Sequence, residues 1–86
     1  MPSFLVETYL GPADAGELGA RESRARSAAA TLTSVRFEGS IHVPEDEMCF
    51  FVFDAPTGRE AALAAQRAGL DAIRVVEAVS SEKEDR

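Results

Sequence analysis

Residues 35–54 read VRFEGSIHVPEDEMCFFVFD, and this stretch decides the fold. Its first part alternates between apolar and polar side chains, which is typical of a β-strand with one buried face. Its last part is apolar at nearly every position, as expected of a central strand covered on both sides. The segment PEDE between them begins at Pro44 and predicts a tight turn. The stretch is therefore predicted to form a β-hairpin.

A symmetrical hairpin centred on this turn also fixes which residues face each other. Directly opposed residues have Cβ atoms about 4.5–5.5 Å apart and point to the same face of the sheet. A one-residue bulge would break this inference. The only histidine and the only cysteine of the chain become cross-strand neighbours. The predicted pairs are Val43 with Met48, His42 with Cys49, Ile41 with Phe50, and Ser40 with Phe51.

Two helices and two further strands complete the chain. Each helix begins with a residue pair in capping-box spacing, and the second ends at a glycine. The first strand is rich in aromatic and branched residues. The predicted elements are a strand at 3–10, a helix from Asp14 with Glu17 at its capping position, a helix from Thr57 with Glu60 closing at Gly69, and a strand at 73–79.

The order β-α-β-β-α-β predicts an α+β, ferredoxin-like domain. This architecture has a four-stranded antiparallel sheet with two helices on one face. One domain spans residues 1–80, and the polar residues 81–86 are predicted to be a disordered, charged tail.

Strict alternation divides the sheet into two faces. Two helices cover only one face, so apolar side chains are left uncovered on the other. They predict a homodimer formed through this open sheet face. The set expected beneath the helices is Val35, Phe37, Ile41, Phe50 and Val52. The set expected on the open face is Leu5, Glu7, Tyr9, Arg36, Glu38, Ser40, His42, Cys49, Phe51 and Phe53.

Composition excludes several classes of partner. The 86 residues carry a net charge of -6, which disfavours nucleic acid. No apolar run approaches the roughly 20 residues that span a bilayer, and no secretory signal pattern opens the chain. A single cysteine makes no internal disulfide. We therefore expect a cytoplasmic protein that contacts neither nucleic acid nor membrane.

Two groups of residues are candidates for a site. The first would line a ligand cavity between the paired sheets, although a structural ion pair that closes the sheet face explains its charges more simply. Its members are Glu7, Tyr9, Arg36, Glu38, Phe51 and Phe53. The second is His42 with Cys49, whose imidazole and thiolate suit zinc, nickel or copper. Two ligands are half of the usual four, so nearby carboxylates or a second subunit would supply the rest. A half-buried cysteine beside a hairpin histidine, without any ligand, is the alternative.

The runs VRFEGSIHVPEDEMCFFVFDAP and REAALAAQRAGLDAIRVVEAV resemble a family of small actinobacterial proteins related to a nickel-binding protein. The resemblance covers nearly the whole chain up to the charged tail. It implies a ferredoxin-like subunit, a dimer and bound nickel. Members carry a histidine in the second helix just before RAG, where this chain has Ala64.

We therefore expect a small, dimeric, non-catalytic protein that binds a ligand, with a divalent transition metal such as nickel as the first candidate. The alternative is a cofactor-free dimeric α/β-barrel enzyme, similar to monooxygenases or cyclases. It would act on a small organic substrate in a cavity lined by Glu7, Tyr9, Arg36, Glu38 and His42, with His42 or a carboxylate as general base. A structural or regulatory dimer without a ligand is the third reading.

Overall fold

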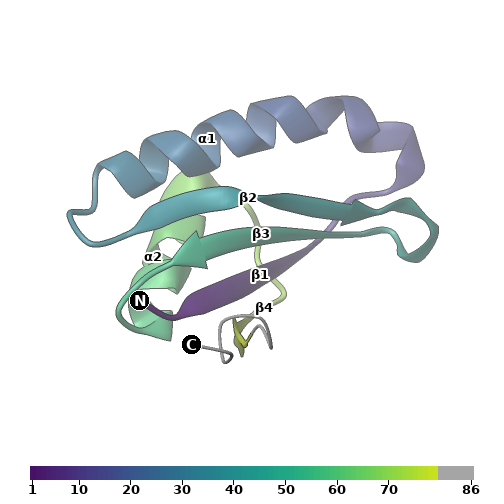
Figure 1. Ribbon diagram of the computed structural model, residues 1–86. Coiled ribbons are helices and arrows are strands. Elements are labelled where there is room, and N and C mark those ends of the chain that lie inside the picture. Colours follow the sequence, from purple (N-terminus) through teal and green to yellow (C-terminus); the bar gives the residue numbers. More distant parts are fainter. Residues whose placement is uncertain (80–86) are drawn as a thin grey trace.

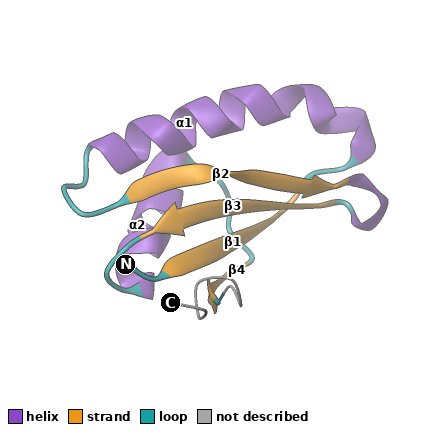
Figure 2. Ribbon diagram, in the orientation of Figure 1, coloured by secondary structure: helices purple, strands orange, loops and turns teal. Residues whose placement is uncertain are grey.

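The computed structural model describes residues 1–79. All the predicted strands and helices are present, and two short 3₁₀ helices are added (Figures 1 and 2). The elements are β1 (Ser3–Tyr9), η1 (Pro12–Glu17), α1 (Leu18–Ala30), β2 (Arg36–Val43), η2 (Pro44–Asp46), β3 (Met48–Asp54), α2 (Gly58–Ala68) and β4 (Arg74–Ala78). The predicted tail, residues 81–86, lies outside the described residues.

The four strands form one sheet in the order β2-β3-β1-β4, and every neighbouring pair is antiparallel. Both helices lie on the same side of this sheet (Figure 1). The chain is a ferredoxin-like α+β fold, as the order of elements predicted.

The hairpin register is confirmed. His42 faces Cys49 and Ile41 faces Phe50, and the other two predicted pairs also form. The turn itself is a short 3₁₀ helix that ends at Glu47 in a left-handed conformation, with φ of 55°. The Glu47 amide donates to the Pro44 carbonyl over 3.0 Å, which closes the turn.

The assignment of faces is wrong for most of the hairpin. Cys49, Phe51 and Phe53 are fully buried in the core with the helices, whereas Ile41 is 54% exposed on the open face. One cause is a bulge in β2, where Phe37 pairs with Phe53 but the next paired residue is Gly39, opposite Val52. The extra residue reverses the alternation along β2, so Phe37 and Ile41 point to opposite faces.

The core is built from small helix residues and large sheet residues. Alanines on both helices let the helix backbones approach the sheet closely, and three phenylalanine rings fill the remaining space. The alanines are Ala25, Ala28, Ala29, Ala61, Ala64, Ala65 and Ala68, and the rings are Phe4, Phe51 and Phe53. The helices therefore fix the inner face of the sheet, which is the face that carries Cys49.

The ends of α2 follow the prediction more closely than the start of α1. Gly69 takes the left-handed conformation, and the Leu70 amide donates to the Ala65 carbonyl, as in a Schellman motif. Thr57 is the N-cap as predicted, but the capping box does not form, because the Thr57 hydroxyl donates to the Glu60 carboxylate over 2.6 Å and neither side chain caps a backbone amide. The predicted start of the first helix at Asp14 is wrong, because η1 occupies this segment and α1 begins at Leu18.

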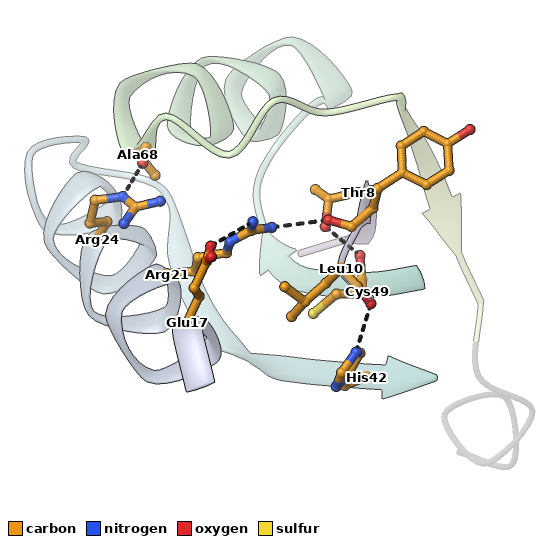
Figure 3. Close-up of polar contacts among 9 residues, drawn as sticks. Thr8, Leu10, Glu17, Arg21, Arg24, His42, Cys49 and Ala68 are labelled. Atoms are coloured by element: carbon orange, nitrogen blue, oxygen red, sulfur yellow. Dashed lines mark hydrogen bonds and ion pairs between the residues drawn. The ribbon is translucent and has the colours of Figure 1, made fainter. Parts of the chain in front are cut away.

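Two arginines join the helices at their C-terminal ends. Arg24 of α1 donates from Nε to the Ala68 carbonyl at the end of α2, over 2.8 Å (Figure 3). Arg67 of α2 donates to the Thr31 hydroxyl, which in turn donates to the Ala28 carbonyl of α1. Each helix thus provides a cation at the negative end of the other helix's dipole.

We predict that Arg24→Met lowers the free energy of unfolding by about 1 kcal/mol, because it removes a charged hydrogen bond from a helix C-terminus. Urea denaturation followed by circular dichroism measures this change. Arg59→Met is the matched control, since Arg59 is exposed on α2, and should change stability by less than about 0.5 kcal/mol. Equal stability of the two variants would refute the role given to Arg24.

Candidate functional site

The open face of the sheet consists of rows of side chains that run across the strands. The strand registers place Gly39, Val52, Leu5 and Val76 side by side in one row, here called the small row. The next row is formed by Ile41, Phe50, Glu7 and Arg74, here called the large row. No helix covers these rows, and most of their side chains are half-buried or exposed. An uncovered apolar surface of this kind marks an interface or a ligand site.

An ion pair interrupts the large row. The Arg74 Nε lies 3.0 Å from the Glu7 carboxylate, and Glu7 is on the central strand β1 with only 13% of its side chain exposed. The Arg74 side chain is 66% exposed. Within residues 1–79, this guanidinium has no other polar partner.

Sequence reasoning missed Arg74, although it proposed Glu7. Alternation along residues 74–78 puts Arg74 and Val76 on one face, which was a usable signal. The pairing of Arg74 with Glu7 could not be predicted from the sequence, because it depends on the register between the first and last strands.

The other proposed cavity residues divide between the two faces. Tyr9 and Arg36 share the open face with Glu7, and Glu38 at the bulge lies 3.6 Å from the Arg36 guanidinium. Phe51 and Phe53 are fully buried on the inner face, so they do not line a cavity with Glu7.

A polar layer lies between α1 and the inner face of the sheet (Figure 3). The Thr8 hydroxyl donates to the Cys49 carbonyl over 2.9 Å, and Arg21 donates to the Tyr9 carbonyl over 3.1 Å. Beside it, the Ser40 hydroxyl donates to the Glu22 carboxylate over 2.5 Å. These bonds tie the first turns of α1 to the sheet and satisfy polar groups that would otherwise be costly to bury.

His42 is held at the edge of this layer. Its Nε2 lies 2.9 Å from the Leu10 carbonyl oxygen (Figure 3). Because a carbonyl oxygen only accepts hydrogen bonds, Nε2 carries a proton, and Nδ1 is the ring atom left for a ligand.

Cys49 is fully buried opposite His42. Burial raises the pKa of the Cys49 thiol above its ordinary value, with a smaller lowering effect from Arg21 and a small raising effect from Glu22. The thiol is therefore held in its protonated form, whereas metal binding and nucleophilic attack both need the thiolate.

These residues do not fit a metal centre within one subunit. No group of three or more His, Cys, Asp or Glu side chains in residues 1–79 is placed to hold an ion. Ala64, which stands where the resembling family has a histidine, is fully buried in the core. A metal at His42 and Cys49 would have to ionise a buried thiol and recruit donors from elsewhere.

The geometry also separates the proposed general base from the open face. His42 and Glu7 lie on opposite faces of the sheet, since His42 is in register with Cys49 and Glu7 with Phe50. A substrate held at Glu7 is therefore out of reach of the His42 ring, because hydrogen-bond contact needs about 2.6–3.2 Å.

Comparison with known proteins supports the fold. The crystal structure of SCO4226 from Streptomyces coelicolor A3(2) matches 91% of this chain and 98% of that chain, with a TM-score of 0.77 and 16% sequence identity. At this identity the likeness shows the fold alone. No family model and no curated protein matches the chain, so the relation to a nickel-binding family stays a prediction. Within the part of the chain that the structure describes, no helix is long and apolar enough to cross a membrane.

We predict that Cys49 does not react with DTNB in the native protein at pH 8, because the thiol is inaccessible and its pKa is raised. The same sample in concentrated urea should react completely within the mixing time. Raising the native protein to pH 9 should leave the reaction slow, since an unfolded thiol ionises near pH 8.5 but the folded one does so only at higher pH. Rapid modification of the native protein at pH 8 would contradict this placement of the thiol.

Proposed function

We propose that this protein is a small, non-catalytic homodimer that binds a ligand between two sheets packed through their open faces. The observation that carries the proposal is the uncovered small row, which crosses all four strands and carries apolar side chains on three of them, beside the Glu7–Arg74 pair. Two sheets that pack face to face lie about 10 Å apart, which removes such a surface from water.

A second copy of this chain is the favoured occupant because the open face is nearly neutral. The whole chain carries a net charge of -6, but the open face sets Arg74 and Arg36 against Glu7, Glu38 and Asp54, so its charges nearly balance. Two copies therefore meet there with less repulsion than their net charge produces elsewhere. A two-fold axis also makes the same patch serve both partners.

We predict that Val52→Asp converts the dimer to a monomer, because it places an unpaired carboxylate in the middle of the small row. The dissociation constant should rise by roughly thirtyfold or more, equivalent to at least about 2 kcal/mol. Sedimentation velocity measures the change, and Ala62→Asp on the exposed side of α2 is the matched control.

A second variant is needed because Val52→Asp could lose the dimer through a folding defect. Ile41→Glu changes a side chain that is already 54% exposed in one subunit, so its fold should be retained by circular dichroism. A wild-type protein that remains monomeric at high micromolar concentration would refute the dimer, as would two variants that dimerise normally.

Nickel at His42 and Cys49 is the second candidate, favoured by their confirmed cross-strand pairing. We predict that, if nickel is the ligand, native mass spectrometry shows a fixed whole number of ions for each dimer, and that His42→Ala and Cys49→Ala each reduce it. Tyr9→Phe is a control with an unchanged donor pair. A wild-type dimer that stays metal-free at low excess of nickel would exclude this candidate and leave the inter-sheet ligand.

A further inference from the structure

We propose that the ligand of the open face is an amphipathic carboxylate, with its carboxylate bound by Arg74 and its apolar body lying along the small row. This inference rests on the proposed binding function and names the chemical class of the ligand. It concerns residues that lie outside the polar layer around His42 and Cys49.

Within the described residues, the Arg74 guanidinium leaves some of its donors without a protein acceptor. Its Nε is occupied by Glu7 at 3.0 Å, and the terminal Nη groups have no acceptor within residues 1–79. Two Nη groups form a planar fork that matches the two oxygens of a carboxylate. Glu7 restrains the side chain from one edge, so the fork is oriented before a ligand arrives.

An apolar surface lies beside the fork. On β4, Val76 follows Arg74 on the same face and belongs to the small row, with Leu5 and Val52 beyond it. The row ends at Gly39, which has no side chain and whose Cβ position faces open space. Three strand spacings of about 4.8 Å make this row about 14 Å long, with its cation in the neighbouring row at the β4 end.

Leaving the fork unbound is costly in the dimer. Packing a second sheet over Arg74 removes water from donors that have no protein acceptor. A carboxylate from a ligand satisfies both donors at once, and its apolar chain covers Leu5 and Val76. Charge and apolar surface therefore select the same class of molecule.

The arrangement predicts opposite effects for the two members of the ion pair. Arg74→Met removes the fork and should weaken binding by about tenfold or more, the effect of losing a charged hydrogen bond. Glu7→Gln keeps a side-chain oxygen beside the Arg74 Nε but removes a negative charge close to the bound carboxylate. It should therefore tighten binding several-fold. A purely structural ion pair would not produce this opposite pair of effects.

The experiment is a titration of the full chain with octanoate and, separately, with octanamide, which has the same body without the charge. Chemical-shift changes or calorimetry at about 0.15 M salt give the affinities, and sedimentation of the same samples gives the oligomeric state. Arg59→Met is the matched control, because it removes an arginine from the helix layer, and should bind within twofold of wild type, roughly the scatter of such surface changes.

The outcomes separate this inference from the dimer. A preference for octanoate over octanamide that is lost in Arg74→Met and enhanced in Glu7→Gln supports the carboxylate site. A dimer that binds both molecules equally, or neither, overturns the site and leaves the dimer standing. A monomer with the predicted preference supports the site and refutes the dimer. In the last outcome, wild type binds no octanoate and Arg74→Met no longer dimerises. The fork would then contact the partner subunit, and the inference would be overturned.

Discussion

Strand β3 is apolar on both of its faces, yet two helices cover only one side of the sheet. Cys49, Phe51 and Phe53 lie beneath the helices, so Phe50 and Val52 are left on the other side. The apolar open face is a direct consequence, because alternation along a strand forces every second side chain outward. The proposed dimer and its ligand site both depend on this division.

The helices contribute to the core mainly through small side chains at their contacts with the sheet. Seven buried alanines bring them close to the sheet, and Ala64 is one of these, fully buried in the core. The same closeness buries Cys49 and raises the pKa of its thiol. The requirement for a tightly packed core therefore conflicts with a thiolate ligand at this position.

Charge on the sheet is organised by face. The inner face holds a polar layer in which Thr8, Ser40 and His42 each have a hydrogen-bond partner. Within residues 1–79 the open face holds two ion pairs, and in each of them the arginine contacts its carboxylate through Nε and leaves its Nη donors unused. The polar layer, whose groups have hydrogen-bond partners, stabilises the position of α1. Arginine donors without a partner on an apolar surface are groups that a ligand can bind.

The sequence by itself determined the order of the elements, the register of the hairpin and the place of Glu7 and Tyr9 on the open face. Those features depend on short-range signals: alternation, a proline-initiated turn and a glycine at a helix end. The tertiary structure alone decided which side of β3 the helices cover, because both sides are apolar and hydrophobicity does not distinguish them. It also decided the bulge before Gly39, which reverses alternation by one residue, and the pairing of Glu7 with Arg74. That pairing joins the first and last strands, and contacts between segments so far apart in the chain form only when the whole sheet is assembled.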